Sequence, residues 1–394
     1  MPTSKKIALV LDPVSARRLA PGMLPCFKPG KRFLLLDALR PPAELRSELE
    51  RWQPDGIVMR VQPETNQLLM KMRKPIVISG GNRAGPVLAS VSVDNEKVGA
   101  EAARQLLGLG LQSIGFFGIN APFSFQRQGG FLAALRESGK QPSVFVDPRL
   151  GWEHYMEIIE GTDEGLIEWV RRLSAPAGIF AAHDPLGWHL TEVCRQAGIA
   201  VPEEVAVIGA NNDVLVCSLS SPPLTSVAIP WKRIGAELAI ELDRMLEGAK
   251  TGDSTASRGQ LLKIAPEGVV IRQSTDILAV DRPLLRRALA FIREHAGEPT
   301  TVSDILNHVP MSRRKLELDF VQHLKRTPKE EITRVRIERA KVILAETDLP
   351  IPMVAERCGF NYAERFTVAF RRSEGTTPQV FRKSMQPRTV QDIE

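Results

Sequence analysis

Residues 351–372, "IPMVAERCGFNYAERFTVAFRR", contain a helical pattern that stops at Cys358-Gly359 and then resumes. Phe366 and Phe370 stand four residues apart, so both lie on one face of the second helix. Glycine readily takes the left-handed conformation that ends a helix, and Phe360 can then fill the angle between the two helices. The stretch therefore predicts two short helices joined by a tight turn.

A second copy of this unit lies upstream. Residues 302–320, "VSDILNHVPMSRRKLELDF", align with 351–370 at an offset of 49 residues over the first helix and 50 over the second. Its turn falls at Val309-Pro310, and a long basic helix is expected at 330–346. One such unit could be an ordinary helical hairpin. Two units around a long helix favour a pair of helix-turn-helix motifs, which present their second helix to the DNA major groove.

The C-terminal third resembles the DNA-binding domain of AraC/XylS-type transcription regulators. The matching segments are "ERAKVIL", "CGF", "RFTVAFRR" and "GTTPQVFRK". The resemblance implies an all-helical domain at 284–394 with helix-turn-helix units at 302–324 and 351–374, and it places family positions at Gly359, Phe360, Arg371, Gly375 and Pro378. Pro310 stands where the family often has Gly. Glu317 and Asp319 put acid on a helix that is usually basic, so we expect the first unit to bind DNA less tightly.

Eight exposed residues are the candidates for DNA contact. Arg can hold guanine through two hydrogen bonds, Asn can hold adenine, and Glu can accept from cytosine. Arg371 and Arg372 suit phosphate contacts better. The alternative for each residue is a solvated surface charge. The candidates are Arg313, Arg314, Glu317, Asn361, Glu364, Arg365, Arg371 and Arg372.

The first 275 residues alternate short apolar runs with amphipathic stretches. Strands are expected at 6–12, 32–38, 55–61, 74–81, 113–119, 143–147, 177–184 and 204–213, and helices at 41–52, 95–110, 123–139, 163–174 and 185–198. This alternation predicts parallel sheets covered by helices, with enough strands for two sheets. The pattern changes at a linker expected over 276–283. The predicted fold class is thus an α/β domain at 1–275 followed by an all-α domain.

The α/β part is similar to the effector domain of LacI-type repressors and periplasmic sugar-binding proteins. The similarity covers residues 93–118, 127–135, 178–213 and 222–246. It implies two lobes that close on a sugar. The domain order, with the sugar-binding-like part first and the AraC-type part last, resembles that of xylose-operon activators of enteric bacteria.

The resemblance carries a candidate ligand site onto six residues: Asp12, Ser15, Arg127, His183, Asp184 and Asn211. Arg127 would hold ring or hydroxyl oxygens, or else be an exposed helix charge. Asp184 would contact ligand, cap the helix that starts at Pro185, or do both. Asn211 stands where sugar-binding relatives often have Asp, and this loss of a carboxylate predicts that D-xylose is a poor effector. Phe123, Trp152 and Trp188 would stack on a sugar or pack in the core.

Composition limits the remaining possibilities. Residues 281–394 hold 21 basic and 16 acidic residues, whereas the rest of the chain holds 31 and 30, so the basic excess lies in the helical part. Four scattered cysteines, without a CxxC pair, favour a reducing cytoplasm and argue against a zinc site. We expect no signal peptide, membrane span, metal or cofactor.

The function predicted is a ligand-responsive, sequence-specific transcription regulator, an activator of a carbohydrate catabolic operon and not an enzyme. Its expected partners are operator DNA, a sugar effector, a second copy in a homodimer, and RNA polymerase. One alternative is a cytoplasmic sugar-processing enzyme, but the chain lacks G-x-G-x-x-G, G-x-x-x-x-G-K-[ST] and G-x-S-x-G motifs. Another is a solute-binding protein with a basic helical tail.

Overall fold

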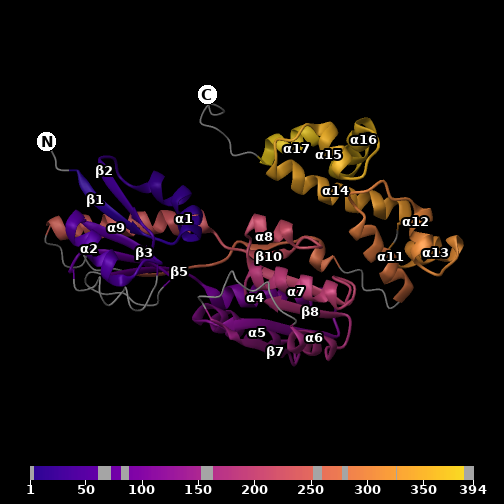
Figure 1. Ribbon diagram of the computed structural model, residues 1–394, viewed down its shortest axis with the longest axis horizontal. Coiled ribbons are helices and arrows are strands. Elements are labelled where there is room, and N and C mark those ends of the chain that lie inside the picture. Colours follow the sequence, from indigo (N-terminus) through magenta and orange to yellow (C-terminus); the bar gives the residue numbers. More distant parts are fainter. Residues whose placement is uncertain are drawn as a thin grey trace.

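The computed structural model describes residues 4–60, 72–80, 88–151, 163–251, 260–276, 283–324 and 326–385. Three parts follow one another along the long axis of the molecule (Figure 1). Two are α/β lobes, and the third is a set of helices at the C-terminal end of the chain. This is the predicted fold class of a two-lobed α/β domain followed by an all-helical domain. Trp152 and most of the expected 276–283 linker lie outside the described residues.

The first lobe is built on a six-stranded parallel sheet of order β11-β5-β4-β3-β1-β2. Its inner strands are apolar because helices cover them, as expected for parallel sheets, whereas the edge strands are partly exposed. The strands are β1 (Lys5–Val10), β2 (Lys31–Leu36), β3 (Gly56–Arg60), β4 (Ile76–Ser79), β5 (Leu88–Val93) and β11 (Leu261–Ile264). The helices are α1 (Pro13–Cys26), α2 (Pro42–Trp52) and α9 (Trp231–Thr251), and α9 packs along α1.

The second lobe holds a sheet of order β12-β10-β9-β8-β6-β7, in which only β12 is antiparallel to its neighbour. The strands are β6 (Ser113–Asn120), β7 (Ser143–Gly151), β8 (Ala177–Ala181), β9 (Val205–Asn211), β10 (Thr225–Ala228) and β12 (Gly268–Val270). The helices are α4 (Asn95–Leu107), α5 (Pro122–Glu137), α6 (Glu164–Arg171), α7 (Asp184–Gln196) and α8 (Val214–Leu219), followed by a 3₁₀ turn at Gln273–Thr275. The chain passes between the sheets after β5, β10 and β11, which makes two lobes of one domain.

The third part has two small cores that share one long helix. The helices are α11 (Pro283–Glu294), α12 (Val302–His308), α13 (Arg313–Leu324), α14 (Pro328–Glu346), α15 (Ile351–Arg357), α16 (Ala363–Glu374) and α17 (Pro378–Met385). Ile332 and Val335 of α14 pack with the α12–α13 unit, and Ile337, Ala340 and Leu344 pack with the α15–α16 unit. The long helix therefore holds the two units rigidly apart.

The turn in the α15–α16 unit depends on a glycine. Gly359 has φ +71°, and a Cβ there would lie 2.2 Å from the carbonyl oxygen of Glu298. The Phe360 ring packs against Phe366, with ring centroids 5.3 Å apart, and the Arg336 guanidinium lies over the Phe360 ring. In the α12–α13 unit the corresponding turn carries Pro310 after the buried Val309. Both units therefore form, although only one has the glycine.

Buried charges join the second lobe to the helical part. Arg293 of α11 pairs with Glu203, which precedes β9, and donates to the carbonyl of Asp276 at 2.6 Å. Arg334 of α14 pairs with the carboxylate of Asp276 and, at 2.8 Å, with the fully buried Glu331. We call these five residues the junction network. It connects a loop beside β9 to the helix that carries both helical units.

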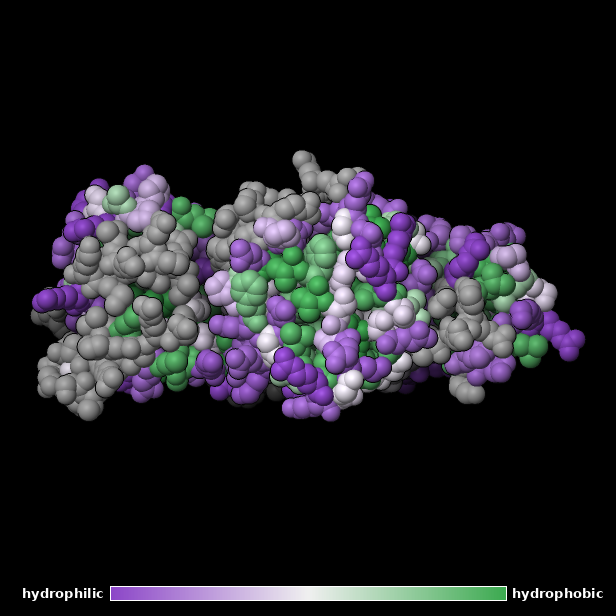
Figure 2. Space-filling view, turned by 90° about the horizontal axis from the view of Figure 1, so that it is seen from below, coloured by the Kyte–Doolittle hydropathy of each residue, from purple (hydrophilic) through white to green (hydrophobic). Residues whose placement is uncertain are grey.

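The surface is mixed in character. Figure 2 shows hydrophobic residues gathered over the middle of one face of the molecule, where the second lobe lies, with hydrophilic side chains interrupting them. Within the part of the chain that the structure describes, none of the helices has the length and apolar character needed to cross a membrane.

Candidate functional site

Arg127 is the centre of the polar cluster in the second lobe. It lies on α5 and is 3% exposed, which excludes the exposed helix charge considered above. Its guanidinium donates to the Asn95 Oδ1 atom at 3.0 Å, to the Ala182 carbonyl at 2.6 Å and to the Asn211 Oδ1 atom at 3.1 Å. The Phe123 ring lies under it, 5.1 Å away. Arg127 therefore ties together the start of α4 and the carboxyl ends of β8 and β9.

His183 stands at the start of α7. Its Nδ1 atom accepts from the backbone N–H of Leu186 at 3.4 Å, so His183, rather than Asp184, is the residue that caps this helix. Complete burial and the neighbouring Arg127 hold the pKa of His183 well below its usual range. The imidazole is therefore neutral near pH 7 and can exchange hydrogen bonds with a neutral polar ligand.

Asp184 uses both carboxylate oxygens inside the protein. Oδ1 accepts from the Ser226 hydroxyl at 2.5 Å, and Oδ2 accepts from the backbone N–H of Asp213 at 2.7 Å. The side chain is fully buried, and this burial raises its pKa from 3.8 to about 6. Its geometry is that of a brace between β10 and the loop after β9.

The loop after β9 adopts an unusual backbone. Asn211 and Asn212 have φ angles of 120° and 52°, which non-glycine residues seldom adopt. Arg127 holds the Asn211 side chain, the Trp231 indole donates to the Asn211 carbonyl at 3.2 Å, and Arg272 donates to the Asn212 Oδ1 atom at 2.7 Å. These contacts stabilise a strained loop at the end of the sheet where α/β folds bind ligands.

The first lobe places a second polar group at the carboxyl end of β1. Asp12 caps α1 by accepting from the Ser15 N–H at 2.9 Å, and Arg60 lies 3.4 Å from its other oxygen and donates to the Ser15 hydroxyl. Burial alone would raise the pKa of Asp12, but Arg60 and the Ser15 hydrogen bonds lower it. The sequence prediction missed Arg60, although a charge that directly ends the apolar strand β3 is a usable signal.

One ion pair joins the two lobes at this place. Arg18 of α1 lies 2.6 Å from the carboxylate of Asp213, and its guanidinium stacks 5.2 Å from the Trp231 ring. Both charged side chains are largely buried, 16% and 24% exposed. The pair brings Asp12 and Ser15 to the same side of the molecule as Asn211. No local pattern signals it, because the partners are 195 residues apart.

The three aromatic residues predicted to stack on a sugar or pack in the core differ in where they lie. Phe123 lies between Arg127 and His183, with 5.7 Å between the Phe123 and His183 ring centroids, so it belongs to the polar cluster. Trp188 is half-buried on α7. Trp152 lies outside the described residues.

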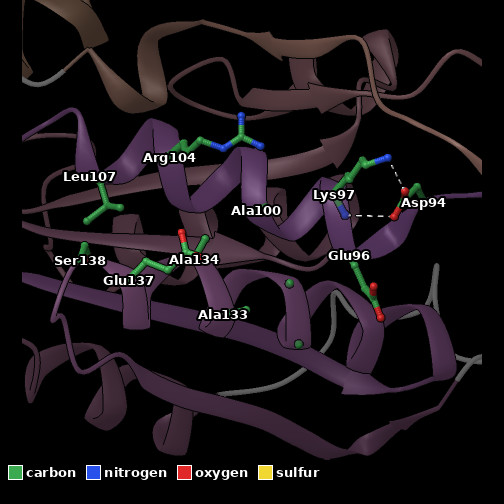
Figure 3. Close-up of a pocket in the computed structure, with 12 residues that line it drawn as sticks. Asp94, Glu96, Lys97, Ala100, Arg104, Leu107, Ala133, Ala134, Glu137 and Ser138 are labelled. Atoms are coloured by element: carbon green, nitrogen blue, oxygen red, sulfur yellow. Dashed lines mark hydrogen bonds and ion pairs between the residues drawn. The ribbon is translucent and has the colours of Figure 1, made fainter.

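A separate open groove runs between α4 and α5 (Figure 3). Its lining includes Asp94, Lys97, Arg104 and Glu137, and Asp94 pairs with Lys97 at 3.0 Å. None of the six predicted ligand residues lines it. The groove lies on the exposed surface of these two helices, and its lining residues Asp94 and Glu96 flank Asn95, which Arg127 contacts. Among the described residues, no group of three or more His, Cys, Asp or Glu side chains is placed to hold a metal ion.

All eight predicted DNA-contact residues are exposed on α13, on α16 or in the turn before α16. Arg313 pairs with Glu317 at 3.1 Å, and Arg365 stacks on Tyr362 at 5.3 Å. Asp319 differs from expectation: it is only 6% exposed, because it lies on the inner side of α13. Its carboxylate therefore lies off the exposed face of this helix, on which Glu317 remains, and weaker DNA binding by the first unit stays a prediction.

Comparison with known proteins agrees with this architecture. Residues 103–275 match a periplasmic binding protein-like domain, and residues 305–384 match a helix-turn-helix domain. The chain is 28% identical to the xylose operon regulatory protein of Haemophilus influenzae over 83% of this chain and 84% of that protein. For the protein of the same name from Escherichia coli K12, the identity is 27% over 85% of each chain. The chain is homologous to the xylose operon regulatory proteins.

Solved structures show the same fold. The structure described as the xylose-binding transcription activator xylR has a TM-score of 0.76 at 24% identity and covers 97% of this chain and 98% of its own. A complex of the transcriptional regulator CelR with cellobiose has a TM-score of 0.56 at 21% identity, covering 69% and 84%. With its two domains, this homologue is a ligand-responsive transcription regulator that binds DNA.

Proposed function

We propose that this regulator activates a carbohydrate catabolic operon in response to a sugar bound between its two lobes. The supporting observation is the arrangement around Arg127, which gathers His183, Asn211 and Phe123 at one end of the second sheet. The Arg127 guanidinium donates, the His183 imidazole and the Asn211 amide can donate or accept, and the Phe123 ring can cover C–H groups, so together they match the faces of a pyranose. Asp12 and Ser15 would meet the sugar from the first lobe.

Asp184 has a different role in this proposal. Because its oxygens are bonded to Ser226 and Asp213, it supports the sugar indirectly by fixing the 211–213 loop. Asn211 in place of a carboxylate predicts weak binding of D-xylose, so the effector would be another sugar. We further propose that the chain works as a cytoplasmic homodimer that contacts RNA polymerase, with no catalytic activity.

Sugar binding shifts the population of lobe arrangements. The sugar would bridge the lobes where Arg18 and Asp213 already meet, and so favour the closed arrangement. Closure would then move the helical parts of the two subunits relative to each other, which changes the operator spacing that they can span.

The test uses the full chain with a panel of pentoses and hexoses, and measures melting temperature and DNA binding. Arg127→Lys keeps the charge but loses the planar fork, so the affinity for the sugar that stabilises the wild type should fall roughly tenfold to a hundredfold. The DNA affinity measured without sugar should stay within about threefold of the wild-type value, because the cores of the helical part are separate from the core of the second lobe. Arg104→Ala, an exposed change on α4, is the matched control. Unchanged sugar affinity in Arg127→Lys would refute this site, and a large melting shift with D-xylose would refute the Asn211 argument.

A further inference from the structure

Two exposed aliphatic side chains occupy equivalent places in the two helix-turn-helix units. Leu318 of α13 is 58% exposed and Val368 of α16 is 69% exposed. The 50-residue offset between the second helices pairs Leu318 with Val368, just as it pairs the fully buried Phe320 with Phe370. The two units therefore share both an inner aromatic residue and an outer aliphatic one.

Helical geometry places each aliphatic residue on the side of its helix opposite the buried residues. At 100° per residue, Leu318 points away from the buried Leu316 and Phe320, as Val368 does from Phe366 and Phe370. Arg314 precedes Leu318 by four residues, and Arg371 follows Val368 by three. An exposed arginine therefore lies on the same helix face as each aliphatic residue. Each helix thus offers an apolar contact beside an arginine on the face directed away from its core.

A single exposed leucine or valine needs no explanation. The same type at the same place in two diverged units does, because these are the helices that this fold presents to the major groove. The apolar group on a base edge in that groove is the C5 methyl of thymine, and aliphatic side chains contact it. The arginines beside each residue fit the phosphates and guanines around such a base.

We propose that Leu318 and Val368 each contact the methyl group of a thymine. The site bound by one subunit then has two halves, one contacted by each helix-turn-helix unit, and each half contains one such thymine. The inference rests on the proposed binding of DNA by α13 and α16. Contact with one methyl group is worth about a fourfold change in Kd, which distinguishes thymine from cytosine at that position. Two such contacts give a preference of more than tenfold without any further hydrogen bond.

The experiment starts by selecting bound duplexes from a random pool with the full chain. Each thymine of the selected site is then replaced singly by deoxyuridine, which removes the methyl group and keeps the base pair. Wild type should bind about fourfold more weakly at one thymine in each half. Leu318→Ala should abolish the difference at one of these thymines, and Val368→Ala should abolish it at the other. Both residues are exposed, so unchanged melting temperatures should accompany these results.

Leu215→Ala is the matched control, because Leu215 is an aliphatic residue on α8, 69% exposed and outside the helix-turn-helix units. It should keep the wild-type response to deoxyuridine. The proposal is overturned if deoxyuridine has no effect in the wild type, if both variants keep the wild-type response, or if the selected site lacks thymine in either half. A pool that yields no bound duplex would overturn DNA binding itself, and with it this inference.

Discussion

Burial changes the chemistry of Asp184, which is fully enclosed and has a pKa of about 6 instead of 3.8. The folded state then holds the proton more tightly than the unfolded chain. This contribution to stability is complete below pH 3.8 and is lost as the pH rises through about 6. Ionisation at neutral pH therefore costs the folded protein free energy.

Replacing Asp184 by Asn removes this titration. Between pH 4 and pH 7, the stability of the wild type should fall relative to Asp184→Asn by roughly 2 kcal/mol. Each pKa unit corresponds to about 1.4 kcal/mol, and part of the contribution is already lost at pH 4. Calorimetry of both proteins at several pH values measures the difference. A difference that does not change with pH would mean that Asp184 is not protonated below pH 6 in the folded protein.

Residue types after strands predicted much of the polar cluster. Arg127, His183, Asp184 and Asn211 come from the second lobe and lie close together, because the carboxyl ends of parallel strands share one edge. The sequence could not distinguish Asp184 as a brace from Asp184 as a ligand contact. That distinction depends on Ser226, which is 42 residues away.

At the scale of elements, the turn between α15 and α16 requires glycine at position 359. Its φ of +71° disfavours any side chain, and a Cβ would lie 2.2 Å from a backbone oxygen that cannot move alone. Gly375 has nearly the same φ, +72°, but nothing lies within 4 Å of its Cβ position. A side chain at position 375 would therefore cause backbone strain alone, whereas a side chain at position 359 would cause both backbone strain and a steric clash.

Gly375→Ala should destabilise the helical part by about 1 kcal/mol through backbone conformation alone. Gly359→Ala should cost clearly more and weaken DNA binding, because the clash moves α16 relative to α15. Urea unfolding followed by circular dichroism, together with DNA titration, compares the two variants. Equal destabilisation would show that the turn relaxes around the added methyl group.

Elements with a clear period were predictable from sequence, and those shaped by contact were not. Helix α1 contains Pro21 and Pro25, which argue against a helix, and no element was predicted at 13–26. Its packing against α9 overrides this, since a Cβ at Gly22 would meet the Lys232 carbonyl oxygen at 1.8 Å. The helix-turn-helix units were recognisable because the pattern occurs twice.

At the scale of the whole molecule, the junction network is the part least visible in sequence. Its charges come from the second lobe, the segment before the linker, α11 and α14, and only the folded chain brings them together. Glu203 and Arg293 are 3% and 7% exposed, so neither charge can be screened well by water. Removing one partner of such a pair leaves an uncompensated buried charge and commonly costs about 3–5 kcal/mol.

The network also connects the strand that leads to the proposed sugar site with the helix that carries both helix-turn-helix units. Glu203 precedes β9, which ends at Asn211, and α14 carries both helix-turn-helix units. A movement of β9 on sugar binding would therefore reach α14 through Arg293 and Asp276. Such a coupling is a free energy by which binding at one site changes the affinity at the other. It is lost when the contacts that connect the two sites are broken.

Glu203→Gln should uncouple the two domains. We expect calorimetry to resolve two separate unfolding transitions, and the effect of the active sugar on DNA affinity to fall at least severalfold, whereas sugar affinity itself stays within about threefold. Glu192→Gln breaks a surface pair with Arg195 on α7 and should leave all three measurements unchanged. If Glu203→Gln keeps the full sugar effect on DNA affinity, the signal reaches the helical part by another route, such as the dimer interface.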